Sequence, residues 1–290
     1  MNDIESLSNK KLLKLLAIIL LSDGTLHNTN NKYYFRLETV IYNKCQHDFF
    51  DFLCKRLFNK KPGKWINKKQ NPKILSSRIY VKKYTEKMLK LSPSYKTTPG
   101  PNMTKEEFLN SDQPSFKFIL EDRNIELKKL ALRTYFDFDG SIVPSFKIKH
   151  KKERKKDRLY EYYQIQFECE INISETNPNL VKEISELCNN LGLRHTIKKD
   201  KRKWSELEGI RISEVKSVKR FINFGGPITN VRISLKSHRI MGKTKRAVCF
   251  AVDDILKNNK LSYYFKDRKS ALEKKSELDK LLISTISKNS

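Results

Sequence analysis

The sequence predicts an α+β protein in which one structural unit occurs twice and a helical extension follows. The main observation is a repeated stretch, at 16–26 and at 132–142, in which an apolar helical run ends in Asp-Gly and passes into an extended segment. The two Asp-Gly pairs lie roughly 116 residues apart, about the size of a small α+β unit. Each copy is followed by the same order of patterns: hairpin, helix, hairpin, helix. We therefore predict two pseudo-symmetric αββαββα repeats with antiparallel sheets.

Hydrophobic periodicity and turn residues define the elements of the first repeat. Ser8 is placed to cap a helix that is apolar nearly all round, so that helix should be covered on both sides. In the second strand, Phe35 and Leu37 belong to a core face, and Arg36 and Glu38 to a wetter face. The expected elements are a helix at 9–22, a hairpin at 24–41 turning at 28–31, a helix at 44–58, a hairpin formed by 64–69 and 74–83, and a helix at 84–91.

The second repeat follows a stretch, 92–115, that is rich in Pro, Gly, Ser and Thr and resembles a linker with a helical turn at 105–110. The expected elements are then a helix at 124–138, strands at 141–151 and 159–173 around a very basic turn at 151–158, a helix at 178–191, strands at 194–200 and 207–214, and a helix at 215–223. Helices near 244–258 and 266–284 lie outside the repeat.

These patterns divide the chain into four parts. We expect a first repeat at 1–95, a linker at 96–120, a second repeat at 121–228 and a C-terminal helical extension at 229–290.

The charge balance predicts a polyanionic partner. Lys and Arg number 60 against 33 Asp and Glu, which gives a formal net charge of +27 and a pI of about 9.8. Nucleic acid is the commonest partner of such a surface. The alternative is a Lys-rich proteome from an AT-rich genome, which the abundant Lys, Asn and Ile also fit.

The cysteines and the apolar segments indicate a reduced, non-membrane protein. The five cysteines are odd in number and show no Cys-x-x-Cys spacing, which disfavours a zinc site or a disulfide framework. The apolar run at 12–21 follows Asp3 and Glu5 and is too short to span a bilayer. We expect no membrane association, no secretion, and an intracellular location with DNA, in the cytoplasm, a nucleoid or an organelle matrix.

The duplicated layout and the stretches Leu16–Gly24 and Leu132–Gly140 resemble the LAGLIDADG homing endonucleases in their monomeric two-repeat form. The resemblance covers about 9–225. It implies that the motif helices pack on a pseudo-twofold axis and that two four-stranded sheets form a saddle over double-stranded DNA. The sixth motif position is acidic in the second copy (Asp137) but is Leu21 in the first. Arg133 stands at a position where the family has a small residue, so it should lie at the interface edge or pair with an acid.

The resemblance also implies the metal ligands. The acidic eighth motif residues, Asp23 and Asp139, would hold a divalent cation, Mg²⁺ or Mn²⁺, and the carbonyls of Ser22 and Phe138 would join them. Two carboxylates at a helix seam suit phosphodiester hydrolysis, in which bound metal activates water and stabilises charge on the phosphoryl and leaving oxygens. Either aspartate taken singly is equally well a helix end, since Gly readily adopts the left-handed cap conformation.

A polar residue and a lysine after the second strand of each half complete the site by the same resemblance. Asn43 and Lys44 match in the first half, whereas the second half has Glu175-Thr176 and lacks the lysine. Lys44 would then serve one strand only, or Lys147 or Lys149 would serve the other. A solvated cation at a helix start explains Lys44 equally well.

The wetter strand faces carry side chains that can read base edges in the major groove. Taken singly, each is equally well an ordinary exposed strand residue, and Glu168 and Glu170 can pair with Lys147 or Lys149 across the hairpin. The two sets differ, which predicts a long asymmetric target. The candidates are Thr25, His27, Tyr34, Arg36, Glu38, Ser76 and Arg78 in the first half, and Ser141, Ser145, Lys147, Lys149, Gln164, Gln166, Glu168, Glu170, Asn172, Lys198 and Arg211 in the second.

The expected function is therefore a site-specific double-strand DNA endonuclease that acts as a monomer with a divalent metal. The alternative is a non-catalytic binder on the same scaffold, either a maturase that takes intron RNA or a DNA-binding regulator. Retention of both acids favours the nuclease. The first residue, Met, and the absence of a terminal His-Asn pair favour a free-standing intron-encoded protein over an intein.

Overall fold

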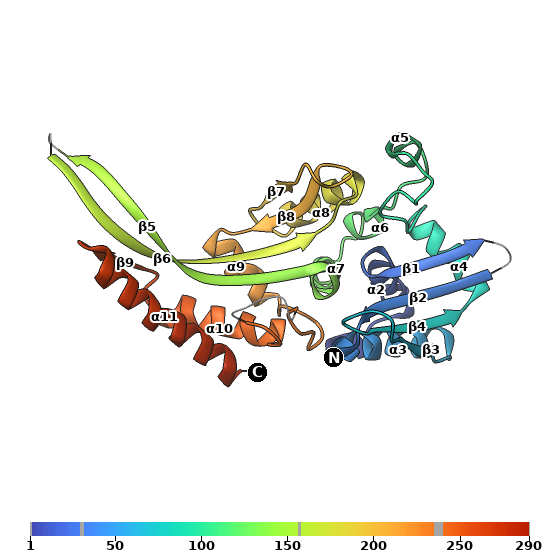
Figure 1. The fold of residues 1–290 in the computed structure, drawn as a ribbon. Coiled ribbons are helices and arrows are strands. Elements are labelled where there is room, and N and C mark those ends of the chain that lie inside the picture. Colours follow the sequence, from blue (N-terminus) through green and yellow to red (C-terminus); the bar gives the residue numbers. More distant parts are fainter. Residues whose placement is uncertain (1, 30–31, 156–157, 235–239, 290) are drawn as a thin grey trace.

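The computed structural model describes residues 2–29, 32–155, 158–234 and 240–289 (Figure 1). Within these ranges the protein is α+β, with two antiparallel sheets on opposite sides of a pair of central helices, α2 (Asn9–Leu21) and α7 (Ile125–Asp139). The predicted fold class is confirmed. The two sheets have equivalent strand orders, β1-β2-β4-β3 and β5-β6-β8-β7, as a duplication requires.

The first repeat forms as expected. Phe35 and Leu37 are buried against α2 and α3, whereas Arg36 and Glu38 lie on the uncovered face of the sheet. The turn expected at 28–31 falls partly on 30–31, outside the described residues. The elements are α1 (Asn2–Glu5), α2, β1 (Gly24–Thr29), β2 (Lys32–Val40), the short helix η1 (Ile41–Asn43), α3 (Lys44–Phe58), β3 (Gly63–Asn67), β4 (Ile74–Tyr80) and α4 (Lys82–Leu91).

The stretch between the repeats is packed into the protein. Its expected helical turn is α5 (Lys105–Leu109), which Thr104 begins with a capping box. A further helix, α6 (Lys117–Leu120), was not expected from the sequence, and Phe116 and Ile119 are fully buried there against α7 and α8. Its sequence is too short to show a helical period, so burial of its apolar side chains decides the conformation. The division at 96–120 stays a prediction.

The second repeat has the predicted order of elements but a much longer hairpin. Pro178 begins the second helix of this repeat, and Gly192 follows that helix at φ +65, in the left-handed conformation that ends many helices. The elements are α7, β5 (Gly140–Lys155), β6 (Arg158–Ser174), α8 (Pro178–Asn190), β7 (Thr196–Lys199), β8 (Leu207–Ile212) and α9 (Val215–Asn223).

The basic turn predicted at 151–158 is wrong for 151–155, where β5 continues. Lys151 pairs with Tyr162 and Lys152 with Glu161 in an uninterrupted antiparallel register. The Lys152 Nζ lies 2.7 Å from a Glu161 carboxylate oxygen. Cross-strand pairs of opposite charge and aromatic partners offset the repulsion among the lysines, so the ladder persists. Residues 156–157 of the predicted turn lie outside the described part of the chain.

The extension contains the two expected helices, α10 (Lys245–Asn258) and α11 (Arg268–Lys288), and one strand that was not expected. This strand, β9 (Ser262–Phe265), pairs with β6 from Gln166 to Tyr163. The four residues of β9 show no alternation of apolar and polar side chains in the sequence. They form a strand because they pair with the open edge of β6. Helices α10 and α11 pack on β5 and lie along the long hairpin in Figure 1. None of the described helices combines the length and hydrophobicity needed to cross a membrane.

Candidate active site

The motif helices α2 and α7 pack against each other at the centre of the molecule (Figure 1). Ala17, Ile18 and Thr134 are fully buried, and the Thr134 hydroxyl donates to the carbonyl of Leu130 one turn earlier, so it leaves no unsatisfied polar group at the seam. Arg133 lies at the edge of the seam, which is one of the two positions expected for it. Its Nε donates to the carbonyl of Gly226 at 2.8 Å.

The glycine after each acid is required for space. Gly140 has φ −97 and ψ 161, so it is extended, and the expectation of a left-handed cap is wrong for this helix end. A Cβ on Gly140 would lie 2.4 Å from the Phe136 carbonyl oxygen, and one on Gly24 would lie 2.6 Å from the Cα of Leu20. The chain passes from α7 directly into β5, and from α2 into β1 through Ser22 and Asp23, and in both cases it stays close to the last helix turn. Only glycine allows that path, which brings both acids to the helix seam.

Asp23 and Asp139 form a close pair of carboxylates. Burial raises the pKa of Asp23 to about 6, and the ammonium of Lys245 opposes that rise. Burial also raises the pKa of Asp139 well above its ordinary value, and the negative charges of Asp23 and Glu175 raise it further. In the described part of the chain, neither carboxylate has a hydrogen-bond donor or an ion-pair partner within bonding distance. The pair is thus a concentration of negative charge that no direct hydrogen bond or ion pair among the described residues offsets, and Lys245 compensates it only through its charge.

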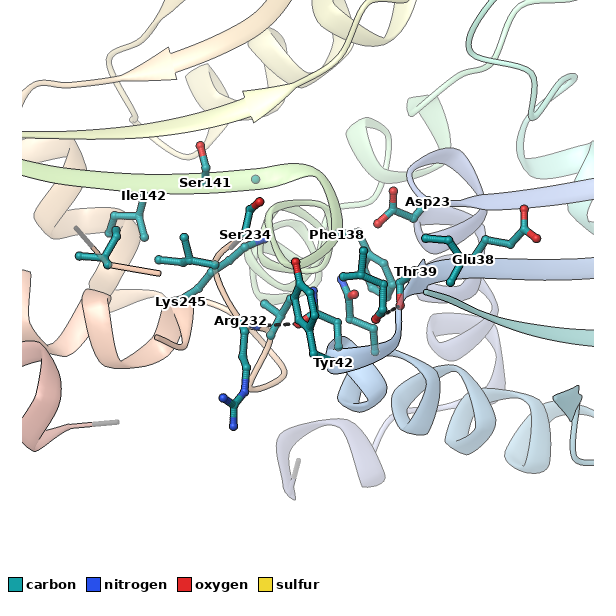
Figure 2. Close-up of a pocket in the computed structure, with 18 of the residues that line it drawn as sticks. Asp23, Glu38, Thr39, Tyr42, Phe138, Ser141, Ile142, Arg232, Ser234 and Lys245 are labelled. Carbon is teal, nitrogen blue, oxygen red and sulfur yellow. Dashed lines mark hydrogen bonds between the residues drawn. The ribbon is translucent and has the colours of Figure 1, made fainter. Parts of the chain in front are cut away.

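Within the described ranges, each motif aspartate lines its own pocket, with Glu38 in the pocket of Asp23 and with Glu175 and Glu208 in the pocket of Asp139. The pocket of Asp23 has a volume of about 540 Å³ and includes Phe138, the residue before the other acid (Figure 2). The pocket of Asp139 has a volume of about 260 Å³ and includes Ser22, the residue before the first acid. Each pocket therefore combines the acid of one motif with the backbone of the other, as two pseudo-symmetric half-sites would.

The donor set suits a hard divalent cation. The described residues contain no group of three or more His, Cys, Asp or Glu side chains placed to hold a metal. Mg²⁺ commonly binds to one or two carboxylates and completes its shell with waters and substrate phosphates. Asp23 and Asp139 have raised pKa values and no direct hydrogen-bond or ion-pair partner among the described residues, and Phe138 and Ser22 line the same two pockets. These residues fit a cation that keeps several waters, and not one bound by protein ligands alone.

Asn43 and Lys44 are separated by the fold. Asn43 is buried, lines the Asp23 pocket, and its Oδ1 accepts from the backbone N–H of Arg232 at 2.9 Å. Lys44 begins α3 with an exposed side chain and does not line either pocket. The two predicted catalytic residues are neighbours in the sequence, but only Asn43 lines a pocket of the site.

Neither lysine suggested for the second half reaches Asp139. Lys147 lies seven strand residues beyond Gly140, which at ~3.3 Å per residue is about 23 Å, and Lys149 lies further still. Both pair instead with Glu168, at 2.8 and 2.6 Å, as the cross-hairpin alternative predicted. The expectation that they substitute for a missing active-site lysine is not supported by this distance.

Lys203, in the turn between β7 and β8, lines the Asp139 pocket instead. The turn is held at the end of β6, because the Trp204 indole N–H donates to the Thr176 hydroxyl at 3.0 Å and the Ser205 hydroxyl donates to the Thr176 carbonyl. Lys203 was not predicted as a site residue, because no local pattern in the sequence distinguishes it from its basic neighbours.

Glu175 is a buried acid beside Asp139. Its carboxylate accepts hydrogen bonds from the Tyr135 hydroxyl and from the backbone N–H groups of Thr176 and Asn177. Burial raises its pKa, and these three donors oppose the rise. Because its oxygens are occupied by these donors, Glu175 orders the end of β6 next to the Asp139 pocket.

The uncovered face of the first sheet is rich in rings and cations. His27 stacks on Tyr34 with ring centroids 4.6 Å apart, and the Arg78 guanidinium lies 4.6 Å from the Tyr34 centroid. Thr25 lies opposite Arg36 in register, on the same face. The expectation that Ser76 offers an exposed contact is wrong, because it is fully buried and donates to Glu38 at 2.8 Å.

The uncovered face of the second sheet carries a network of alternating charges. Arg211 and Lys147 both face Glu170, at 3.7 and 4.0 Å, and Lys198 pairs with Glu208 at 3.0 Å. Strand alternation is as predicted, with the apolar residues of β6 buried. The remaining candidates lie on this same partly exposed face: Ser141, Ser145, Lys149, Gln164, Gln166, Glu168 and Asn172.

All five cysteines lie in the described part of the chain and carry free thiols, four of them buried, as the spacing indicated.

No family model and no curated protein matches the chain. Among solved structures, it is similar to the homing endonuclease I-DmoI in complex with DNA and Mn, with 17% identity over 80% of this chain and 99% of that one, at a TM-score of 0.44. It is also similar to the homing endonuclease I-WcaI bound to its DNA recognition sequence, with 14% identity, coverage of 74% and 80%, and a TM-score of 0.41.

A third similar structure is the N-terminal LAGLIDADG domain of DUF199/WhiA, with 13% identity, coverage of 79% and 85%, and a TM-score of 0.41. The structural neighbours are homing endonucleases and a LAGLIDADG domain, as the duplicated motif predicted.

Proposed function

We propose that this protein is a metal-dependent, site-specific DNA endonuclease that hydrolyses one phosphodiester in each strand of a long asymmetric target. The observation that carries the proposal is the meeting of Asp23 and Asp139 at the α2–α7 seam, unpartnered and in two adjacent pockets. A pure binding protein gains nothing from two carboxylates beside phosphates, which repel them. A nuclease needs such a pair for its cation.

The half-sites assign different residues to the two strands. On one side Asp23 and the Phe138 carbonyl would hold a divalent cation, Mg²⁺ or Mn²⁺, and on the other Asp139 and the Ser22 carbonyl would do so. When bound, the cation activates water and stabilises the charge that develops on the phosphoryl oxygens. Lys203 is placed to contact a phosphate in the Asp139 pocket. We assign it the role that the sequence left open between Lys147 and Lys149.

Binding would use the uncovered sheet faces. Arg, Gln and Glu side chains there match acceptors and donors of the major groove, and the excess of lysine provides phosphate contacts. The two repeats supply a complete pair of acids within one chain, so we propose that a monomer acts, at an intracellular location with DNA.

Cleavage-site selection from a random or genomic DNA pool tests the function directly. With Mg²⁺, the full chain should linearise molecules that carry one recurring sequence and leave two defined ends. D23N and D139N should each reduce double-strand cleavage by at least about a hundredfold, because each removes a cation ligand. D112N, which changes an exposed carboxylate away from the seam, is the matched control and should cut like the wild type.

The test also separates the alternative function. Binding that survives chelation, with no cleavage product under any divalent cation, would identify a DNA-binding regulator, and selective binding of structured RNA would identify a maturase. Full cutting of both strands by D23N and D139N would contradict the assignment of the acids.

A further inference from the structure

The C-terminal extension places a lysine inside the active site. Lys245 is the first residue of α10, and its side chain is buried, with 5% of the residue exposed. Its Nζ donates to the carbonyl oxygens of Phe136, at 2.9 Å, and Asp137, at 2.8 Å, in the last turn of α7. Lys245 also lines the pocket of Asp23 (Figure 2). An extension that lies outside the repeat thus contacts the end of the second motif helix.

The backbone that leads to Lys245 is tied to the same site. The Thr229 N–H donates to the Asp137 carboxylate at 3.1 Å, and the Arg232 N–H donates to Asn43 Oδ1 at 2.9 Å. The N–H of Lys245 itself donates to the carbonyl of Val231 at 2.9 Å. The start of the extension therefore runs between α7 and the first repeat, and these bonds determine the position of the ammonium.

Lys245 occupies a position that its own helix disfavours. A cation in the first turn of α10 faces the positive end of that helix dipole. The same ammonium lies at the negative end of α7 and experiences the charges of Asp137, Asp139 and Asp23. A buried cation is retained only where hydrogen bonds and opposite charges compensate its lost hydration. The carbonyls and carboxylates at the end of α7 supply that compensation.

We propose that Lys245 is a positioning residue of the active site: it holds the last turn of α7 and is the fixed countercharge of Asp23 and Asp139, so the extension is an integral part of the site. The effect on cleavage rests on the proposed nuclease function, whereas the countercharge does not. The competing explanation is that Lys245 is buried only to pair with Asp137. Its carboxylate also interacts with Lys245, and a structural pair between these two residues alone would leave the acid pair uninvolved.

A double-mutant cycle on thermal unfolding of the metal-free full chain distinguishes the two explanations. K245M should lower the Tm by about 5 °C or more, because it leaves buried carboxylates and carbonyls uncompensated. In the D23N/D139N background the decrease should shrink to half or less. K257M changes an exposed lysine of the same helix and should shift the Tm equally little in both backgrounds.

The proposal is overturned if K245M lowers the Tm equally in the wild-type and D23N/D139N backgrounds, and likewise if only D137N removes its effect. If K245M cannot be purified folded, recovery of folded K245M/D23N/D139N supports the proposal, and failure of that variant also overturns it. For cleavage, K245R should retain at least tenfold more activity than K245M at a temperature where both are folded. A wild-type protein that does not cut at all contradicts the nuclease function and leaves the unfolding cycle as the test of Lys245.

Discussion

At the scale of single residues, the two motif aspartates combine burial with the absence of direct partners in the described part of the chain. Most buried carboxylates are paired or hydrogen-bonded, as Glu175 is by Tyr135 and two backbone N–H groups. Asp23 and Asp139 instead line two separate pockets at the helix seam, and the charge of Asp23 raises the pKa of Asp139. A bound cation would relieve the repulsion between these carboxylates. Their raised pKa values also predict how the stability of the metal-free protein depends on pH.

Without metal, D23N should be more stable than the wild type at pH 7 but not at pH 4. The pKa of Asp23 is raised from 3.8 to about 6 by burial, so the native state still holds a proton that the unfolded chain has released. Wild-type stability contributed by this group is therefore present below pH 4 and is lost as the pH rises to 6. The difference in unfolding free energy between D23N and the wild type should reach roughly 1 to 3 kcal/mol at pH 7, because partial exposure of Asp23 to solvent weakens the effect.

Urea unfolding of both proteins in EDTA from pH 4 to 8 measures this gap, with D112N as the control that should show no such trend. Addition of Mn²⁺ at pH 7 should narrow the gap by stabilising the wild type. A gap that opened toward low pH would show that Asp23 is stabilised in its charged form and has partners of its own.

At the scale of elements, the end of each motif helix depends on a close turn from helix to strand. β5 begins at Gly140 directly after α7 ends, with no intervening loop. This path keeps Asp139 at the seam and directs the hairpin away from it. The α2–β1 connection differs by two turn residues, Ser22 and Asp23, but its glycine is packed equally closely on the preceding helix turn.

G140A should destabilise the protein by about 3 kcal/mol, because the new methyl group meets backbone that cannot move without displacing the helix end. Its Cβ would lie 2.4 Å from the Phe136 carbonyl oxygen, whereas a Cβ on Gly100 meets nothing within 4 Å. G100A is therefore the matched control, expected within about 1 kcal/mol of the wild type. Equal unfolding free energies for the two variants, by urea titration, would refute this account of the motif glycine.

At the scale of the whole molecule, the two repeats have the same topology but different reach. β5 and β6 have 16 and 17 residues, against 6 and 9 for β1 and β2, so the second hairpin extends far beyond its counterpart (Figure 1). α10 and α11 pack on this hairpin and β9 pairs with it from Tyr163 to Gln166, and its distal end extends beyond them (Figure 1). We expect the DNA footprint to extend further on the side bound by the second repeat.

The distal hairpin should contact phosphates through one of its faces. Lys151 and Arg158 share the face of Lys147 and Lys149, whereas Lys152 and Arg154 lie on the opposite face. K151Q/R158Q should lower the slope of log affinity against log salt by about 1 to 2, according to how many phosphate contacts are lost. K152Q/R154Q is the control of equal charge and should leave the slope unchanged. Equal slopes for the two variants, measured by fluorescence anisotropy, would show that phosphate contacts are not confined to the face of Lys151 and Arg158.

The sequence by itself determined the local features of this protein. The duplicated Asp-Gly stretches, the strand alternation of Phe35 and Leu37, and helix signals such as Pro178 depend on neighbours close along the chain, and all appear where periodicity placed them. The central position of the motif helices was expected from the family resemblance, and the equivalent strand orders of the two sheets agree with the duplication.

Tertiary structure alone decided which charges meet at the site. Lys245 and Lys203 reach the acid pair from segments far from either motif, whereas Lys44, next to a predicted site residue, faces solvent. The strand β9 forms because β6 offers an open edge, and Ser76 is buried beside its neighbours on β2 and β3, with its hydroxyl donating to Glu38. Each of these depends on contacts between distant segments, which leave no periodic trace in the sequence because they arise only when the packed elements meet.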